Sequence, residues 1–257
     1  MGRLDKKVCV ITGAGGGMGR EATLLFSREG ALVCAADVDQ ALVDKVADEA
    51  EGDVLALRCD VADENSVAAM YKATAERFGG VDVLYNNAGI SPADDDSVLT
   101  TTVDAWQRVQ DVNTKGVFLC CKHGIPYLLE RGSGSVINVA SFVAVVGAAT
   151  SQISYTASKG AVLSMSRELA VQFARQGVRV NALCPGPVET PLLLRIFGDD
   201  PEALDRRRRH WPTGRLAKPT EIVQAALFLA SDESSYVNGS TFLVDGGLTA
   251  AYVTPQD

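Results

Sequence analysis

Short apolar runs alternate with longer amphipathic stretches along most of the chain. The short runs are apolar on both faces and predict buried strands at 7–12, 31–37, 54–59, 81–85, 135–140, 178–183 and 241–244. Between them, apolar residues recur at helical spacing and predict helices at 18–28, 42–50, 64–78, 103–130, 155–175 and 220–230. This alternation is typical of a parallel sheet that is covered by helices on both faces.

The connections between these elements are short, and no composition break marks a linker. The sequence therefore predicts a single domain over 1–257, an α/β doubly wound parallel sheet of the Rossmann type with about seven strands. One segment, 186–218, is a long insertion after the sixth strand. Because ligands bind at the carboxyl ends of the strands in this architecture, we expect this insertion to be a substrate lid. The alternative is an ordinary surface excursion.

The composition excludes several classes of protein. The 257 residues carry a formal net charge of −8, whereas a nucleic-acid-binding protein needs a basic face. No apolar run reaches the ~18 residues of a membrane helix, and the N-terminal residues lack the pattern of a signal peptide. We therefore expect a cytoplasmic protein that binds neither nucleic acid nor membranes.

The six cysteines predict packing rather than metal binding. Four of them lie in or at the end of predicted strands, where a free cysteine serves as a small buried hydrophobic residue in a reducing compartment. The sequence CCKH, from Cys120 to His123, superficially suggests a metal pair. No second Cys/His pair follows at zinc spacing, so we expect no metal site.

A glycine-rich sequence, TGAGGGMG, joins the first predicted strand to the first predicted helix. Its glycines permit a sharp turn and a close approach of the backbone to a diphosphate, which the N-terminus of the helix then attracts. A flexible turn is the alternative, but the flanking strand and helix favour a dinucleotide site. The candidate cofactor-binding residues are Gly13, Gly16, Gly17, Met18 and Gly19.

Asp37 ends the second predicted strand and indicates the form of the cofactor. A carboxylate at this position accepts hydrogen bonds from the adenosine ribose and repels a 2′-phosphate. Gly16 in the loop and Val38 after the acid leave no base nearby in sequence to pair with that phosphate. These features predict NAD rather than NADP. The alternative is that Asp37 is only a turn residue at the end of the strand.

Further short motifs follow in order along the chain: CDV at 59–61, NNAG at 86–89, VNTKG at 112–116, INVAS at 137–141, YTASK at 155–159, PGPVETP at 185–191 and FLVDGG at 242–247. Together with the glycine-rich loop, they resemble the short-chain dehydrogenase/reductase family over nearly the whole chain. The resemblance implies that the adenine, ribose and nicotinamide of the cofactor contact these residues: Asp60, Val61, Asn87, Ala88, Gly89, Pro185, Gly186, Val188 and Thr190.

The same resemblance implies four catalytic residues: Asn113, Ser141, Tyr155 and Lys159. Tyr155 and Lys159 are four residues apart and share one face of a predicted helix. Tyr155 would be the general acid/base, with its pKa lowered by the Lys159 ammonium and by the oxidised nicotinamide. Ser141 would donate to the substrate oxygen, and Asn113 would position a water in a proton relay; a buried structural amide is the alternative for Asn113.

We therefore expect an enzyme that transfers a hydride between NAD(H) and a small, largely apolar secondary alcohol or ketone. The alternatives are an NADPH-type 3-oxoacyl thioester reductase and a non-catalytic NAD(H)-binding regulator. The arginine run 206–209 would contact an acidic carrier or coenzyme A, or would be a solvated helix face. The resemblance also implies a homotetramer, in which the helices that bear Asn113 and Tyr155 pack across one two-fold axis and the last helix and strand across another. The apolar tail after 247 would reach a neighbouring subunit, or would fray as termini often do.

Overall fold

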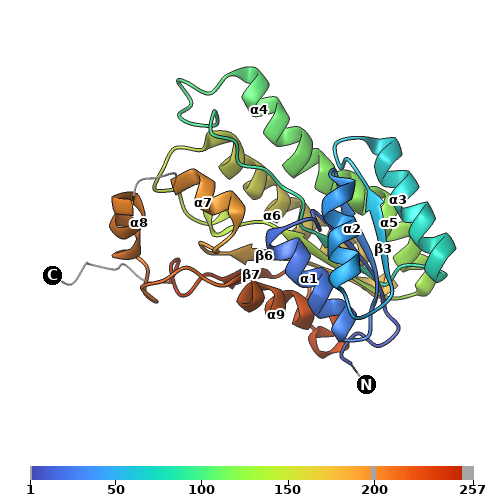
Figure 1. Ribbon diagram of the computed structural model, residues 1–257. Coiled ribbons are helices and arrows are strands. Elements are labelled where there is room, and N and C mark those ends of the chain that lie inside the picture. Colours follow the sequence, from blue (N-terminus) through green and yellow to red (C-terminus); the bar gives the residue numbers. More distant parts are fainter. Residues whose placement is uncertain (1, 198–200, 251–257) are drawn as a thin grey trace.

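The computed structural model describes residues 2–197 and 201–250, in which seven parallel strands form one sheet (Figure 1). The strand order is β3-β2-β1-β4-β5-β6-β7, and every neighbouring pair is parallel. The strands are β1 (Val8–Thr12), β2 (Leu32–Asp37), β3 (Val54–Arg58), β4 (Val83–Asn86), β5 (Gly134–Val139), β6 (Val178–Pro185) and β7 (Thr241–Val244). The predicted doubly wound α/β sheet is confirmed.

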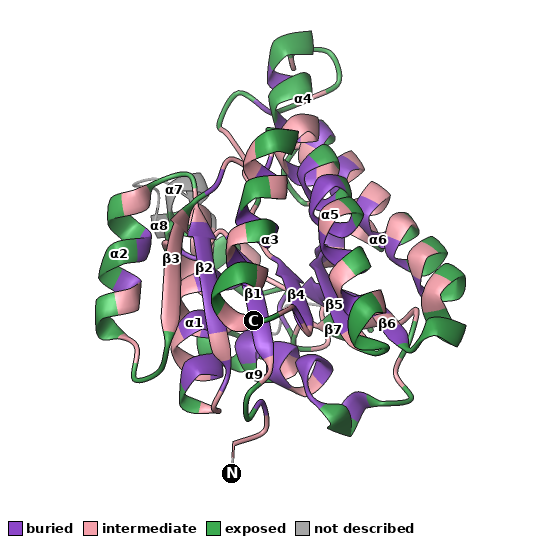
Figure 2. Ribbon diagram, turned by 90° about the vertical axis from the view of Figure 1, so that its right-hand side faces the viewer, coloured by how far each residue is buried: buried purple, intermediate pink, exposed green. Residues whose placement is uncertain are grey.

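Helices cover both faces of the sheet, and two separate buried clusters mark the two layers (Figure 2). One face packs against α1 (Gly17–Arg28), α2 (Gln40–Glu49) and α9 (Pro219–Ala230). The other packs against α3 (Glu64–Phe78), α5 (Gly116–Arg131) and α6 (Ile153–Phe173). Three short 3₁₀ turns connect elements: η2 (Phe142–Ala144), η3 (Ala174–Gln176) and η4 (Asp232–Ser234).

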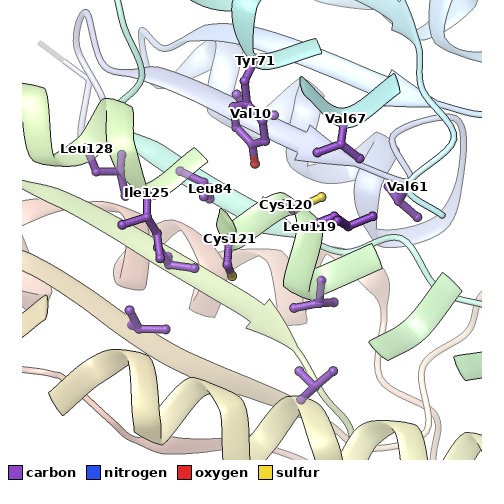
Figure 3. Packing of buried hydrophobic residues seen from close by; sticks show 14 of the residues in the cluster. Val10, Val61, Val67, Tyr71, Leu84, Leu119, Cys120, Cys121, Ile125 and Leu128 are labelled. Carbon is purple, nitrogen blue, oxygen red and sulfur yellow. The ribbon is translucent and has the colours of Figure 1, made fainter. Parts of the chain in front are cut away.

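Alternation along β1 distributes its side chains between the two clusters. Val10 faces the α3–α5 layer with Tyr71 and Leu84 (Figure 3), whereas Cys9 and Ile11 face the α1–α9 layer. Successive side chains of a strand point to opposite faces, so a strand that is buried on both faces is apolar throughout. All six cysteines are buried free thiols, as predicted.

The predicted helix over 103–130 is wrong in one respect. The structure has α4 (Val103–Gln110), a π-helical turn at Asp111–Lys115, and then α5. A π turn adds one residue to a helix and often occurs at a functional position. Here the turn contains Asn113, whose side chain bonds to the loop after β4, so that a tertiary contact accompanies the local change of winding.

The insertion after β6 contains two short helices, α7 (Pro191–Phe197) and α8 (Pro201–Arg208). Figure 1 shows both helices at the end of the molecule opposite the N-terminus, beyond the carboxyl ends of the strands. Residues 198–200 and the last part of the apolar tail, 251–257, lie outside the described residues. Within the described residues, no helix combines the length and apolarity that crossing a membrane would require.

Candidate active site

A cavity of about 450 Å³ opens at the carboxyl ends of the central strands. β1 lies between β2 and β4, so the winding direction reverses beside it, and ligands of such sheets bind in the resulting crevice. The predicted site residues that line this cavity are Met18, Asn87, Gly89, Ser141, Tyr155, Lys159, Pro185, Gly186, Val188 and Thr190. The other predicted site residues are not part of its lining: Gly13, Gly16, Gly17, Gly19, Asp37, Asp60, Val61, Ala88 and Asn113.

The loop between β1 and α1 has the backbone that a diphosphate cradle requires. Gly13 and Gly17 have φ of 65° and 53°, in the left-handed region that favours glycine. A Cβ on Gly19 would lie 2.0 Å from the carbonyl oxygen of Gly13, so no other residue fits there. A Cβ on Gly16 would meet nothing within 4 Å. The residues present therefore fit a dinucleotide whose phosphates approach the N-terminus of α1.

Thr12 ties this loop to the end of β4. Its hydroxyl oxygen accepts hydrogen bonds from the backbone N–H groups of Asn87 (3.1 Å) and Ala88 (3.2 Å). The Asn87 amide in turn donates to the carbonyl oxygens of Thr12 (3.0 Å) and Gly13 (3.2 Å). Thr12 was not among the predicted site residues, and its place at the start of the glycine-rich motif is the only sequence signal for it.

Asp37 lies beside the glycine-rich loop. Its Oδ2 accepts from the backbone N–H of Gly15 at 3.0 Å, and its Oδ1 accepts from that of Asp39 at 3.2 Å. On the neighbouring strand β3, Arg58 occupies the position directly paired with Asp37. The acid is thus fixed at the carboxyl edge of β2, where the ribose of a dinucleotide on this loop would lie.

Asp60 and Val61 follow β3 at the same edge of the sheet. The Asp60 carboxylate accepts from the backbone N–H of Ala62 at 2.9 Å, and its own N–H donates to the Ser66 hydroxyl at 3.0 Å. The Val61 side chain is buried against Gly116, where an added Cβ would lie 2.8 Å from it. These contacts fix the turn after β3, which the resemblance places beside the adenine.

The hydrogen bonds of Asn113 join the loop after β4 to α6. Its Oδ1 accepts from the Ile90 N–H at 2.8 Å, and its Nδ2 donates to the Ile90 carbonyl oxygen at 2.9 Å and to the Ser158 hydroxyl at 3.1 Å. The side chain is fully buried. Both donor hydrogens of the amide are thus engaged within the chain, and the relay role of Asn113 stays a prediction.

Tyr155, Lys159 and Ser141 meet at the base of the cavity. Tyr155 and Lys159 lie one turn apart in α6, and the Lys159 Nζ is 5.5 Å from the centre of the Tyr155 ring. The same Nζ donates to the carbonyl oxygen of Val139, at the end of β5, at 2.8 Å. Ser141 begins the turn after β5, and its hydroxyl accepts from the N–H of Val143 at 3.4 Å.

Burial dominates the ionisation of this group. It raises the pKa of Tyr155 above its usual value of 10.0, and a hydrogen bond with Ser141 offsets part of that rise. It also lowers the pKa of Lys159 from 10.5 to about 8. The expected lowering of the Tyr155 pKa by Lys159 is therefore not found in the chain alone, because Lys159 is itself desolvated and bonded to Val139.

Asp95 is a residue near the site that the sequence did not reveal. Only 5% of it is exposed, and its two carboxylate oxygens accept from the N–H groups of Ser154 (2.9 Å) and Tyr155 (2.8 Å). It thereby caps the first turn of α6, the helix that carries Tyr155. The sequence has three consecutive acids at 94–96 and gives no sign that the middle one is buried.

The segment after β6 folds back over the glycine-rich loop. The Thr190 hydroxyl accepts from the N–H of Leu193 at 3.3 Å, and its methyl group would lie 3.5 Å from a Cβ on Gly17. A Cβ on Gly186 would lie 2.7 Å from the Asp245 backbone, so this turn also requires glycine. The insertion then adds its own side chains to the cavity wall: Leu192, Leu193, Arg207, His210 and Trp211.

The cavity wall is largely apolar. Its side chains from the turn after β5 include Phe142, Val143 and Val146, and small residues follow at 147–149. Such a surface with a few polar groups suits a small organic substrate. Within the part of the chain that the structure describes, no three His, Cys, Asp or Glu side chains are grouped to hold a metal ion.

Comparisons with known proteins agree over almost the whole chain. A family model described as Enoyl-(Acyl carrier protein) reductase matches residues 13–249. The chain is 41% identical over 255 residues to meso-2,3-butanediol dehydrogenase of Serratia marcescens, covering 99% of each. It is 40% identical over 250 residues to 3-oxoacyl-[acyl-carrier-protein] reductase FabG of Thermotoga maritima, covering 96% of this chain and 99% of that one.

The fold agrees equally well with solved structures. Levodione reductase superposes with a TM-score of 0.91 at 34% sequence identity, covering 97% of this chain and 100% of that one. Similarity of this extent in both sequence and structure assigns the chain to a family of oxidoreductases.

Proposed function

The chain belongs to the short-chain dehydrogenase/reductase family, and we propose that it transfers a hydride between NAD(H) and a small secondary alcohol or ketone. The observation that carries this proposal is that Tyr155, Ser141 and Lys159 line one cavity with Gly186 and Thr190, beside the dinucleotide loop. A substrate in this cavity therefore lies between a proton-transfer group and the residues that would surround the nicotinamide.

When bound, the nicotinamide cofactor would supply or accept the hydride. Its phosphates would be held by Gly13, Gly17 and Gly19, its adenosine ribose by Asp37 and its second ribose by Lys159. Asp60, Val61, Asn87, Ala88 and Gly89 would line its adenine and ribose, and Pro185, Gly186, Val188 and Thr190 its carboxamide end.

Tyr155 would give its phenolic proton to the substrate oxygen in reduction and take it back in oxidation. Ser141 would donate a hydrogen bond to that oxygen while charge develops there. Because the protein environment raises the pKa of Tyr155, the chain alone favours the neutral, proton-donating form. Oxidation at neutral pH would then need positive charge near Tyr155 beyond that of Lys159, and the oxidised nicotinamide would supply it.

The choice of NAD rests on Asp37, whose carboxylate is fixed beside the loop by Gly15. The second candidate, an NADPH-type 3-oxoacyl thioester reductase, is favoured by the similarity to FabG and by Arg58, which is paired with Asp37 on β3. The largely apolar cavity and the butanediol dehydrogenase relative favour a small secondary alcohol instead. We further propose that 186–218 is a substrate lid and that the enzyme works in the cytoplasm as a homotetramer.

The proposal is tested by a turnover screen with NAD against NADP over a panel of secondary alcohols, on the wild type and on Tyr155→Phe. We expect oxidation that prefers NAD and a loss of at least ~10³-fold in kcat for the variant, since the ring remains while the proton carrier is removed. NADH binding, measured by fluorescence, should stay within about twofold.

Near-normal turnover in Tyr155→Phe would contradict the assignment of the general acid/base. Tight NADH binding with no turnover of any alcohol by the wild type would favour the non-catalytic regulator. A preference for NADP would favour the thioester reductase.

A further inference from the structure

Two neighbouring residues of β5 attach α6 to the sheet. The Lys159 Nζ donates to the carbonyl oxygen of Val139 at 2.8 Å, and the Asn138 Nδ2 donates to the hydroxyl of Ser166 at 3.0 Å. Lys159 and Ser166 are about two turns apart in α6, so both face the sheet from the same side of the helix. Two attachments at different points along a helix fix its register on the strand as well as its direction.

The bond between Asn138 and Ser166 is buried, and each side chain has a defined part in it. Asn138 is 0% exposed and Ser166 is 1% exposed. The Ser166 hydroxyl donates its own hydrogen to the carbonyl oxygen of Val162 at 2.7 Å, so it meets Asn138 as an acceptor. The Asn138 Oδ1 accepts from the Asn86 Nδ2 at 2.8 Å and from the Cys121 thiol at 3.7 Å. The amide is thus held from both ends, and a buried network of this kind keeps its elements in one arrangement.

The same network lies between the dinucleotide loop and the catalytic residues. Asn86 is directly opposite Asn138 in the pairing of β4 with β5, and the next residue, Asn87, donates to carbonyl oxygens at the start of the dinucleotide loop. Ser141 begins the turn that follows β5. Asn138 therefore lies where the loop, the strand that leads to Ser141 and the helix that carries Tyr155 are tied together.

The two attachments of α6 differ in what a bound cofactor would demand of them. In the proposed function, Lys159 also holds the second ribose, so its three donor hydrogens are divided between Val139 and the cofactor. Neither Asn138 nor Ser166 is part of the cavity lining, and their bond has no such second task. It is therefore the attachment that stays the same when cofactor and substrate bind.

We propose that Asn138 is a positioning residue, which holds α6 on β5 through Ser166 and thereby keeps Tyr155 within hydrogen-bonding reach of Ser141. The inference rests on the proposed function, which gives Tyr155 its task. A displacement of a reacting group by about 1 Å can cost about 100-fold in rate. Burial raises the pKa of Tyr155 and the hydrogen bond with Ser141 lowers it, so a weaker bond leaves the pKa higher.

Ser166→Ala tests the proposal, and Ser135→Ala is its matched control. Ser135 is buried at the start of β5, and its hydroxyl donates to the carbonyl oxygen of Leu229 on α9 at 2.7 Å. Each variant removes one buried hydroxyl that joins β5 to a helix, so we expect similar falls in the midpoint of urea denaturation. Only Ser166→Ala should also lower kcat, by about 10-fold, while KM for NAD stays within about twofold.

Asn138→Ala shows whether the bond itself carries the effect. It should lower kcat at least as much as Ser166→Ala does. Adding Ser166→Ala to Asn138→Ala should then change kcat less than about twofold, since the bond is already absent. Two independent losses that multiply in the double variant would overturn the inference. The comparison of Ser166→Ala with Ser135→Ala holds whether or not Asn138→Ala folds.

Titration of Tyr155 tests the inference without turnover. The phenolate absorbance of each protein saturated with NAD, less that of the same protein carrying Tyr155→Phe, follows the ionisation of Tyr155. We expect the midpoint to lie at higher pH in Ser166→Ala than in the wild type or in Ser135→Ala. Equal midpoints and equal kcat in Ser166→Ala and Ser135→Ala would overturn the inference. A raised midpoint in Ser166→Ala, with no oxidation of any alcohol by the wild type, would instead count against the proposed function alone.

Discussion

Asp37 is the residue on which we expect the choice of cofactor to depend. Its carboxylate is held at the edge of β2 by the N–H groups of Gly15 and Asp39, with Arg58 in the paired position of β3. We expect Asp37→Ala to remove the repulsion of a 2′-phosphate and leave Arg58 beside it. The ratio of kcat/KM for NAD to that for NADP should fall at least ~100-fold, measured by steady-state kinetics.

Asp39→Ala is the control that separates the effect of Asp37 on the cofactor ratio from the loss of any nearby acid. Asp39→Ala removes a nearby acid whose side chain caps α2 by accepting from the N–H groups of Ala41 and Leu42. It should lower stability by about 1 kcal/mol and leave the cofactor ratio within about twofold. An unchanged ratio in Asp37→Ala would show that another feature selects the cofactor.

Lys159 gives the stability of the protein a characteristic pH dependence. Its pKa is about 8 in the folded chain and returns toward 10.5 on unfolding, so between these values the unfolded state binds more protons and stability rises with pH. A shift of this size corresponds to about 3 kcal/mol over the full window. Relative to Lys159→Met, the wild type should therefore gain stability as the pH rises from 8 to 10.

The measurement is urea denaturation of both proteins across that pH range. The comparison with Lys159→Met cancels the titration of the buried thiols that both proteins share, except that of Cys184, whose pKa Lys159 lowers. A difference in stability between the two proteins that does not change with pH would contradict the lowered pKa of Lys159.

At the scale of elements, the first turn of α6 depends on Asp95. Two hydrogen bonds to a charged acceptor contribute about 1.5–3 kcal/mol each, and here they fix the backbone of Ser154 and Tyr155. We expect Asp95→Ala to destabilise the protein by about 3–6 kcal/mol and to lower kcat roughly 10-fold through misplacement of Tyr155. Asp95→Asn keeps one acceptor oxygen, so its stability and its kcat should lie between those of the wild type and those of Asp95→Ala.

The neighbouring acid is the control. The Asp96 side chain is exposed and bonds to Thr100 within its own loop, so Asp96→Ala should change kcat less than about twofold. The quantities compared are kcat and the free energy of unfolding for the three variants. Equal losses for Asp95→Ala and Asp96→Ala would show that the loop, and not the carboxylate, positions α6.

The same elements show what can be predicted from sequence. The strands and most helices follow from runs that are apolar on both faces and from helical spacing, because a parallel sheet buries both of its faces. The π turn around Asn113 could not be predicted, since one extra residue in a helix hardly alters its periodicity and depends on the contact with Ile90. Asp95 was missed for a similar reason, because only the folded loop distinguishes it from Asp94 and Asp96.

The candidate site was easier to predict than the ionisation within it. The motifs place Tyr155, Lys159 and Ser141 on elements whose ends meet in any sheet of this kind. The pKa of Tyr155 depends on how deeply these residues are buried and on where the Lys159 Nζ points, and neither is encoded by spacing. Likewise, the sequence shows four adjacent arginines at 206–209, and only the structure shows that Arg207 is the one of these four that lines the cavity.

On the scale of the whole molecule, α5 and α6 carry apolar residues that the subunit itself does not cover. Phe118 on α5 is 49% exposed and Val171 on α6 is 81% exposed. These helices are the ones expected to pack across a two-fold axis of a homotetramer. We expect the double variant Phe118→Glu, Val171→Glu to have a smaller mass than the wild type in size-exclusion chromatography with light scattering, because four like charges would face one another at that axis.

Leu42→Glu provides the comparison, since Leu42 is 45% exposed on α2, a different helix. Its mass should equal that of the wild type. A wild-type monomer, or a tetramer that persists in the double variant, would contradict the proposed assembly.

The position of β1 between β2 and β4 has a consequence for synthesis of the chain. The residues before β4 leave the ribosome first, and they include the whole dinucleotide loop and Asp37. One edge of β1 has no neighbour until β4 follows, and the cavity has no far wall until β6 is made. Non-local pairing of this kind is slow to form, so the active site of a nascent chain forms in a single late step. A chain stalled before residue 178 therefore has no catalytic activity.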